Sequence, residues 1–423
     1  MVRPRLRFLV FEFKRVLPNI YSEKMKKIFP LLAIAFLLVQ SLSAQEDSIS
    51  YEKRPFQFTF LFPPLSTNGA KNASIINDVS LNLLLGVSGG VEKFEAAGFI
   101  NIDKYYMNGV QLAGFGNTVG GHVSGAQIAG FYNVNETNAS GFQGAGFVNV
   151  AGGSLKGMQG AGFVNVVGDS LEGFQGAGFI NVSGSAKKSV QVAGFGNVIG
   201  EGATHFQGAG FFNVAEEVKG AQVAGFVNVA GNVKGFQGAG FLNICDSIDG
   251  VPLAFISVVK KNGYRKFGFN ISEVQYANFS YKMGVSKLYN IYSFGKPSGP
   301  GSRWMFGAGL GTEIGLSENM RLNIEGTVHQ ELWIADPATT HFLYIDRLNL
   351  YNTVKFLFGW NMGDKVDLHI GPTFNVSVAH TNPDLGVKPL NTIAPYAFYS
   401  HTNNSYNQTR VQMWVGLQGS ISF

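Results

Sequence analysis

The sequence of 423 residues contains a single cysteine, Cys245. One thiol excludes an intrachain disulfide framework and any multi-cysteine zinc site. Only 14% of the residues are charged, against about 25% in ordinary soluble domains. The formal net charge is +5, but residues 1–44 hold eight Lys or Arg and two Glu, so the remainder carries 24 basic and 25 acidic residues. That balance leaves no basic excess to neutralise phosphates and argues against nucleic-acid binding.

The sequence also lacks an apolar run long enough to form a membrane helix, and its one clear apolar run is short. Residues 25–27 are Met-Lys-Lys, an apolar stretch follows from Ile28 to Val39, and small residues lead to Ala44. This is the pattern of a secretory signal peptide, and the stretch is too short for a membrane helix of about 20 residues. We predict a leader over residues 1–44, with translation starting at Met25. An exported chain without a membrane helix is either soluble or inserted in an outer membrane as a closed barrel.

Glycine and phenylalanine are abundant, at 55 and 37 residues, and an aromatic content this high is not typical of disorder. Between residues 94 and 250, Ala-Gly-Phe occurs ten times at a spacing of sixteen and finally fifteen residues. Asn stands three residues after each of these glycines, and Gln stands three before it from the second copy onward. Such an array predicts a repeat architecture. Its central copies supply the candidate ladder Gln143, Ala145, Gly146, Phe147, Asn149, Gln159, Phe163, Asn165, Gln175, Phe179 and Asn181.

With a period of two, each copy sends Gln, Ala, Phe and Asn to one face and variable apolar residues to the other. The variable residues compensate one another, because Phe or Met before the Gln is followed by Gly, and Val or Ala by a branched residue. Connectors hold an apolar residue such as Leu155 or Leu171, which indicates a second short strand. We therefore favour a parallel β-solenoid, with Phe147-type rings stacked and Asn149-type amides in a ladder.

The alternative is that each copy forms one antiparallel transmembrane strand of a wide barrel. Its apolar face would meet lipid, and its Gln and Asn would line a lumen. Barrel turns alternate between short turns and longer loops, whereas these connectors show no such difference. Both interpretations stay open at this point.

The C-terminal part changes to long alternating strands, over residues 304–316, 320–332, 348–360, 366–378 and 411–423. The last strand ends on the aromatic terminus Phe423, which is typical of an outer-membrane barrel strand. We predict eight to twelve antiparallel strands, although a soluble β-sandwich also alternates. The strands of residues 45–93 alternate too, and we expect them to belong to the barrel, the first pairing with the last. The predicted fold is all-β, with a leader at 1–44, N-terminal strands at 45–93, a ten-copy array at 94–250 and a barrel at 251–423.

Residues that could carry chemistry are few. A polar cluster facing the barrel lumen is expected from Arg321, Glu325, His329, Glu331, Asp367 and His369. It could bind a solute or support hydrolysis, but such residues more often fill a small barrel with paired charges, which is the interpretation we favour. The histidines lack metal-binding spacing, so we predict no metal, cofactor or catalytic residue. Cys245 is expected to be a small buried filler.

The export signal, the tandem Gly-x-Gln-x-Ala-Gly-Phe-x-Asn-Val units, the bridge at residues 260–264 (Lys-Lys-Asn-Gly-Tyr) and the barrel-like tail resemble the uncharacterised surface-repeat proteins of Gram-negative outer membranes. This resemblance implies a location and no activity. We expect a non-enzymatic cell-surface protein whose barrel anchors the array for adhesion, assembly or partner docking. Its expected partners are outer-membrane lipid, the barrel-assembly machinery and a protein or surface polysaccharide. The alternatives are an outer-membrane pore or transporter built from the repeats, and an outer-membrane hydrolase.

Overall fold

The computed structural model describes residues 52–61, 65–297, 303–333, 349–363, 366–381, 396–403 and 408–423. The chain divides into two compact units, Met1–Gly240 and Phe241–Phe423. The predicted leader lies outside the described residues. Among those residues the only helix is the six-residue 3-10 turn η3 (Gly69–Ser74), and the rest of the regular structure is β-strand. The all-β prediction is confirmed.

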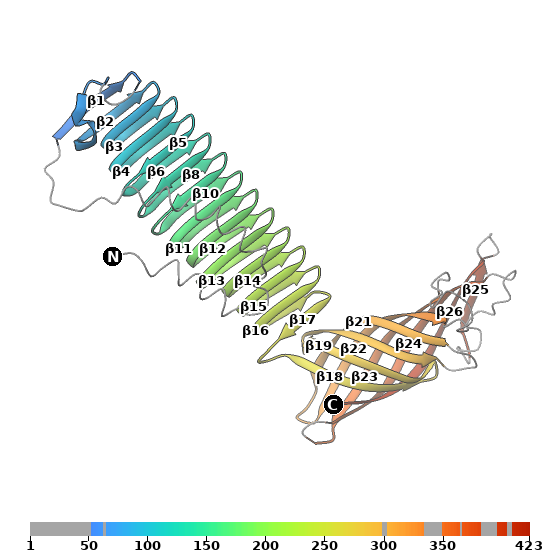
Figure 1. Ribbon diagram of the computed structural model, residues 1–423. Coiled ribbons are helices and arrows are strands. Elements are labelled where there is room, and N and C mark those ends of the chain that lie inside the picture. Colours follow the sequence, from blue (N-terminus) through green and yellow to red (C-terminus); the bar gives the residue numbers. More distant parts are fainter. Residues whose placement is uncertain are drawn as a thin grey trace, which may run out of the picture. The chain divides into compact units, whose positions relative to one another are not determined.

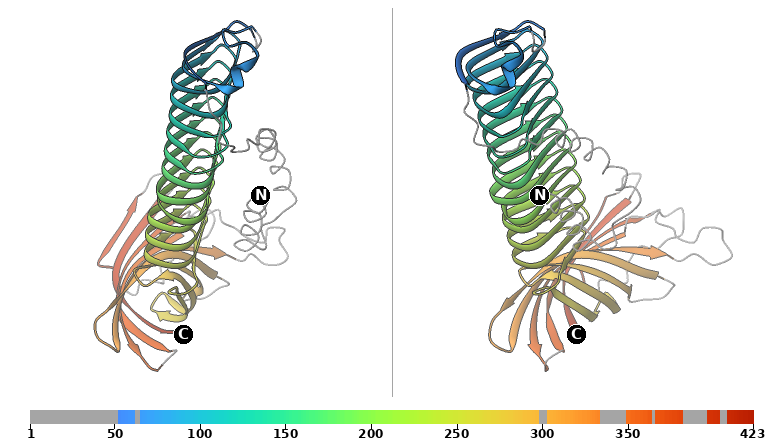
Figure 2. Two further views of the ribbon diagram at one scale, coloured as in Figure 1. Left: turned by 90° about the vertical axis from the view of Figure 1, so that its left-hand side faces the viewer. Right: turned by 60° about the vertical axis from the view of Figure 1, so that its left-hand side comes forward.

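The repeats form a parallel β-solenoid, which confirms the favoured interpretation and excludes antiparallel barrel strands (Figure 1). Its coils stack along one axis (Figure 2). The strands are β1 (Glu52–Thr59), β2 (Ile75–Asn82), β3 (Leu85–Ala97), β4 (Ile100–Ala113), β5 (Gly116–Val119), β6 (His122–Ala129), β7 (Tyr132–Asn135), β8 (Ala139–Ala145), β9 (Val148–Ala151), β10 (Leu155–Ala161), β11 (Val164–Ala177), β12 (Ile180–Ala193), β13 (Gly196–Ala209), β14 (Phe212–Ala224), β15 (Val227–Ala239), β16 (Leu242–Leu253) and β17 (Ile256–Val259).

Each coil has two straight sides. The shorter side, as in β9, carries the Asn, and the longer side, as in β10, carries the Gln. The chain bends at Gly-Phe to pass from a longer side to the next shorter one. A Cβ on Gly146 at this bend would lie 2.1 Å from the carbonyl oxygen of Gly130 one coil away, so only glycine lets the coils stack there.

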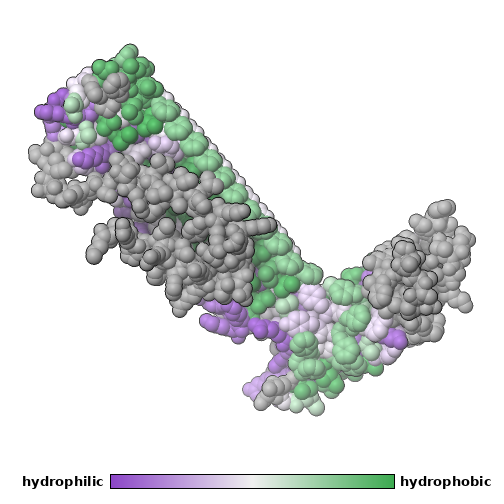
Figure 3. Space-filling model, in the orientation of Figure 1, coloured by the Kyte–Doolittle hydropathy of each residue, from purple (hydrophilic) through white to green (hydrophobic). Residues whose placement is uncertain are grey.

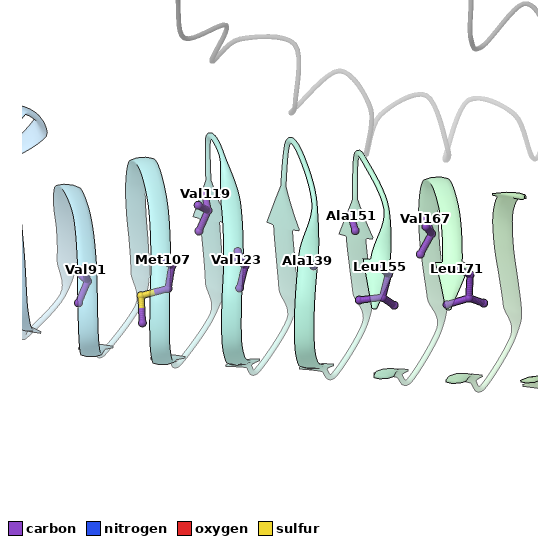
Figure 4. Close-up of a cluster of buried hydrophobic side chains, with 9 residues drawn as sticks. All are labelled: Val91, Met107, Val119, Val123, Ala139, Ala151, Leu155, Val167 and Leu171. Carbon is purple, nitrogen blue, oxygen red and sulfur yellow. The ribbon is translucent and has the colours of Figure 1, made fainter. Parts of the chain in front are cut away.

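The apolar core occupies the half of the coil that lies away from the Gly-Phe bend. Val167 and Leu171 enter it from the two sides of one coil, and both are fully buried. Equivalent side chains repeat from coil to coil and form a continuous column (Figure 4). The connector residues Leu155 and Leu171 therefore face a core, because they lie on the longer side directly after the second turn.

The prediction that residues 45–93 join the barrel is wrong for the described strands. β1 pairs with β2, and β2 with β3, all in parallel within the solenoid sheet. Apolar side chains of β1 point outward, as Phe56 and Phe58 do, while Gln57 is buried. This apolar-out alternation is identical in a lipid-facing barrel strand and in a solenoid side with a polar interior, so the pattern could not separate them.

The solenoid also continues past the predicted array limit of residue 250. Strand β17 pairs in parallel with β16 over Leu242↔Ile256 to Cys245↔Val259. The sequence here departs from the repeat consensus, since Ser257 takes the place of the Asn. The short segment near residues 253–259 is thus the end of the last coil and not a barrel strand.

A closed antiparallel barrel follows. Its eight strands are β18 (Tyr264–Ser272), β19 (Gln275–Val285), β20 (Leu288–Pro297), β21 (Arg303–Gly315), β22 (Met320–Trp333), β23 (Asn349–Asn361), β24 (Asp367–Thr381) and β26 (Gln408–Ser422). The short strand β25 (Tyr399–Asn403) pairs with β26 beside the barrel seam. β26 closes the barrel on β18, over Gly268↔Ser422 to Ser272↔Gln418, and not on an N-terminal strand as predicted.

The barrel strands alternate as expected for contact with lipid outside. Phe267, Phe279 and Phe306 are more than half exposed on the outer wall, whereas Asn278 and Lys282 are buried inside. The terminal residue Phe423 exchanges two backbone hydrogen bonds with Phe267, at 2.8 and 2.9 Å, and its side chain is exposed. The barrel is therefore apolar outside and polar inside along its height.

Candidate functional site

A ladder of glutamine amides runs through the solenoid interior. Gln143 Nε2 donates to Gln127 Oε1 at 2.7 Å, Gln159 to Gln143 at 2.7 Å, and Gln175 to Gln159 at 2.8 Å. All four side chains are buried. Each Gln donates toward the coil before it. The ladder satisfies amides that would otherwise cost free energy to bury.

A second ladder of asparagine amides runs beside it in the opposite direction. Asn149 Nδ2 donates to Asn165 Oδ1, and Asn165 Nδ2 to Asn181 Oδ1, both at 2.9 Å. Asn165 Nδ2 also donates to the carbonyl oxygen of Gly176 on the longer side of its own coil, at 2.7 Å. Each Asn therefore joins two coils and also joins the two sides of one coil.

The phenylalanines do not share the face of these amides, which corrects the sequence prediction. Phe147 and Phe163 lie at the bend and are partly exposed, and their neighbour Phe131 is 41% exposed. Ala145 is half-buried and Gly146 exposed. The bend breaks the two-residue period between Gln143 and Asn149, because alternation holds only along a straight strand.

The rings still stack as predicted, on the outside of the bend. Consecutive centroids are 4.7 to 5.1 Å apart through Phe99, Phe115, Phe131, Phe147, Phe163, Phe179, Phe195, Phe211 and Phe226. The spacing follows from the strand separation of about 4.8 Å. We call this row the phenylalanine column.

The compensated residues beside the Gln pack against one another on the outer surface. A Cβ on Gly144 would lie 2.9 Å from the ring of Phe142, and a Cβ on Gly176 would lie 2.9 Å from the ring of Phe174. Each ring thus lies over the glycine two residues later. Where the first residue is small, a branched side chain such as Ile128 fills the same place, and it is 46% exposed.

Two successive early coils carry buried carboxyl groups. Glu95 stands at the Gln position of β3, and Asp103 lies two residues after Asn101 in β4; both side chains are buried. Gln111 Nε2 donates to Glu95 Oε2 at 2.8 Å and to Asp103 Oδ2 at 2.7 Å. Burial raises the pKa of Glu95, and burial together with the charge of Glu95 raises the pKa of Asp103 well above its usual value. The folded state therefore favours a protonated carboxyl at this pair.

Burial keeps the thiol of Cys245 unreactive. Cys245 is buried in β16 at the position that Val167 occupies in its own coil. Burial, with a smaller contribution from the charge of Asp246, raises the pKa of this thiol to about 12. A thiol that stays protonated is neither a nucleophile nor a metal ligand at neutral pH.

The barrel interior is organised around a buried ion pair. Lys282 Nζ donates to Glu325 Oε1, and Tyr289 donates its hydroxyl proton to the same oxygen at 3.0 Å. Asn323 Nδ2 donates to the Tyr289 hydroxyl oxygen at 2.8 Å. Lys282, Glu325 and Asn323 are at most 3% exposed. A buried charge is tolerated only with such partners.

A second ion-pair group lies nearer the end at which β18 begins. Lys266 Nζ donates to Asp367 Oδ2 at 2.7 Å and to Glu313 Oε2 at 3.1 Å. Arg321 Nη1 lies 3.4 Å from Glu313 Oε1 and 3.8 Å from Asp367 Oδ2. Asn323 connects the two groups through a 3.4 Å contact with Glu313.

The remaining predicted polar residues lie apart from these groups. His329 Nε2 is 2.9 Å from Ser293 Oγ, Asn349 donates its side-chain amide to Glu331, and neither ring nitrogen of His369 contacts a described donor or acceptor. The six predicted residues all line the interior, but they are divided among several small groups rather than gathered in one site.

Sequence reasoning missed the lysines that neutralise these acids. Lys282 shares the inward face of β19 with Asn278 and Ser280, and Lys355 shares that of β23 with Thr353. Applying the alternation to charged residues would have found them. The same alternation could not have shown which acid each lysine meets, because that depends on the register across the closed barrel.

Among the described residues, no group of three or more His, Cys, Asp or Glu side chains is placed to hold a metal ion. Comparison of the chain with protein-family models, with curated proteins and with solved structures gave no match. No described helix is long and apolar enough to cross a membrane.

Proposed function

We propose that this is an outer-membrane protein in which the barrel is the anchor and the repeat array is a non-enzymatic scaffold for assembly or partner docking. The observation that carries the proposal is the closed barrel with an apolar outer wall and an interior of paired charges. Such a wall is suited to lipid. The barrel-assembly machinery and outer-membrane lipid are the partners that insertion of this barrel requires.

The connections between the barrel strands favour one side of the membrane for the array. At one end, two, four and five residues separate successive barrel strands, at 286–287, 316–319 and 362–366. At the other end the separations are two residues at 273–274, five at 298–302, 15 at 334–348 and 26 at 382–407, the last including β25, so both long connections lie at this end. Outer-membrane barrels place short turns in the periplasm and long loops outside.

The array joins the barrel at the short-turn end. Only residues 260–263 separate β17 from β18, and Tyr264 pairs with Gly284 beside the turn at 286–287. This topology favours a periplasmic array, and therefore a periplasmic docking partner, over adhesion to another cell or a surface polysaccharide.

Two features weigh against the alternative functions. The repeats add no strands to the barrel, and an eight-stranded barrel is just wide enough for side chains to fill. The Ser293–His329 contact is the best hydrolase candidate, but both side chains are buried, and no described carboxylate accepts a hydrogen bond from His329 Nδ1 to complete a catalytic triad. A pore and a hydrolase are therefore the less favoured functions.

Cysteine labelling in whole cells tests the location. Lys156→Cys places a thiol on the exposed surface of β10, and Thr402→Cys places one on the exposed strand β25, at the end of the barrel with the long connections. With a membrane-impermeant maleimide, we expect Thr402→Cys to react in intact cells and Lys156→Cys only after the outer membrane is permeabilised. The unsubstituted protein is the control, because its one thiol is buried. Labelling of Lys156→Cys in intact cells would place the array at the cell surface.

Liposome swelling with the purified protein tests the pore alternative. We expect no sugar flux above that of protein-free vesicles. Flux that is lost when the protein is heat-denatured would favour the pore.

A further inference from the structure

The two halves of each solenoid coil have opposite polarity. In the half away from the Gly-Phe bend, Leu171 is buried inside and Glu172 is exposed outside, as in a water-soluble protein. In the half at the bend, Asn165 and Gln175 are buried inside, and the outer surface is apolar. We call this second half the apolar edge. Polar inside and apolar outside is the arrangement of a β-structure surrounded by hydrocarbon.

The apolar edge is continuous along the array. From the residue before each Gln to the residue after each Asn, copies two to ten contain no charged side chain. The outward residues beside the Gln are 37 to 50% exposed at Ile128, Phe142, Met158, Val192, Val223 and Phe236. A green stripe follows one edge of the solenoid in Figure 3. About five residues by ten coils gives a patch of about 800 Å² on this side alone, more than the roughly 300–600 Å² that monomers leave bare.

The backbone N–H groups at the bend are hydrogen-bonded to the neighbouring coil. Gly178 N–H donates to Ala161 O, and Phe179 and Ile180 N–H both donate to Phe163 O, all at 3.1 Å. The same bonds recur at the other bends of the array. An unpaired N–H group costs several kcal/mol in lipid. The paired N–H groups therefore make the bend compatible with hydrocarbon.

The last coil of the array carries apolar rings onto the outer wall of the barrel. Within the second unit, Phe241 stacks on Phe255 with centroids 6.0 Å apart, and Phe255 contacts the ring of Tyr292 edge-on at 5.5 Å. Tyr292 lies on the same face of β20 as Phe294, which is 45% exposed on the barrel wall. The surface of the last coil is thus continuous with the surface that we assign to lipid.

We propose that the apolar edge inserts into the acyl-chain region of a phospholipid leaflet. From the phenylalanine column to the residue before the Gln the edge is about 10–15 Å deep, which matches one leaflet of a hydrocarbon core about 30 Å thick. The exposed charged residues of the opposite edge stay in water. This inference rests on the proposed membrane anchoring, and it makes the array a lipid-binding element. A second copy of the chain covering the same edge is the competing occupant.

The test uses the full chain reconstituted in dioleoylphosphatidylcholine vesicles. Met158→Cys on the apolar edge and Glu201→Cys on the opposite edge are each labelled with the environment-sensitive fluorophore NBD. We expect a blue-shifted emission at position 158, and several-fold stronger quenching there than at position 201 when the lipid carries brominated acyl chains. Val192→Cys repeats the measurement in another coil and guards against a local folding defect.

Each outcome decides between the occupants. Equal, weak quenching at positions 158 and 201 would overturn the proposal. A blue shift at 158 without lipid quenching, together with energy transfer between labelled copies, would assign the edge to a second copy and also overturn it. The barrel tryptophans are the internal control, because Trp360 is 38% exposed on the outer wall. If they are not quenched, the membrane anchoring itself fails; if they are quenched and position 158 is not, only the further inference fails.

Discussion

The asparagine ladder predicts that an isosteric change at its centre disrupts the array. Asn165 Nδ2 donates to Gly176 O and to Asn181 Oδ1, and its Oδ1 accepts from Asn149 Nδ2. Asn165→Asp keeps the shape of the side chain and the accepting oxygen, but an ionised carboxyl has no proton to donate. Two buried acceptors then lose their donors and face a negative charge.

The expected loss of stability follows from these two bonds. Leaving a buried polar group unsatisfied costs about 1–3 kcal/mol, so the substitution should cost about 2–6 kcal/mol at neutral pH. A protonated carboxyl can still donate once, so the folded state raises the pKa of the new group above its unfolded value. The loss is therefore smallest below about pH 4 and grows as the pH rises.

Hydrogen exchange of the full chain in detergent micelles measures the effect coil by coil. A loss of 2 kcal/mol corresponds to about 30-fold faster exchange. Because each coil contacts only its neighbours, the change should be concentrated between residues 148 and 193. Asn232→Asp, the same substitution at an exposed site, is the control. Unchanged protection around Asn165 at pH 8 would refute the reasoning.

Three further predictions concern the carboxyl pair, the outer surface and the barrel. Glu95→Gln with Asp103→Asn should raise the melting temperature of the array at pH 8 and change it little at pH 4. The raised pKa values mean that the stability these carboxyls contribute is present below their unfolded pKa near 4 and lost as the pH rises. Melting curves by circular dichroism check this. A double variant with the same melting temperature as the wild-type protein at pH 8 would contradict the prediction. Gly176→Val should cost about 1–3 kcal/mol by clashing with the ring of Phe174, and adding Phe174→Val should restore most of it. Denaturant unfolding of both variants decides, and a single variant as stable as the double would disprove the packing argument. Glu325→Gln leaves a buried lysine without its carboxylate, at a cost of about 3–5 kcal/mol. The barrel should then unfold at a lower temperature in a gel-shift assay, whereas an unchanged transition would show that the pair is dispensable.

Much of the solenoid could be predicted because its contacts repeat in the sequence. A residue sixteen positions away is the neighbour in the next coil, so Gln143 and Gln159 identify their own partners. The position of the phenylalanines could not be derived in the same way. Alternation assumes a straight chain, and at the bend Gly146 and Phe147 leave the strand, so Phe147 lies outside although Gln143 before it and Asn149 after it are both buried. The glycine before the phenylalanine was the available signal for a turn.

In the barrel, the strand positions could be predicted but the side-chain partners could not. Strand positions were predictable within about three residues, because β21, β22 and β26 alternate over their whole length. Partners were not predictable, because the pairing of Lys266 with Asp367 joins residues 101 positions apart. The assignment of β1 and β2 to the barrel was wrong for a further reason. Alternation shows that a strand has two unlike faces, but it does not show whether the apolar face meets lipid, water or protein.

That ambiguity has a physical origin which also explains how one chain can combine the two units. A parallel stack brings identical side chains to about 4.8 Å from one another, and Asn and Gln each carry a donor and an acceptor in the same group. An amide such as Asn165 can therefore be satisfied by its own copies, with no water and no charge of opposite sign. The solenoid interior can then be polar, which leaves its outer surface free to be apolar. The barrel reaches the same arrangement with unlike partners, by pairing Lys282 with Glu325 across strands that are distant in sequence. In the barrel and in the bend half of each coil, polar groups lie inside and apolar groups face outward, and this shared arrangement suits the barrel wall and the apolar edge to the hydrocarbon environment that we propose for both.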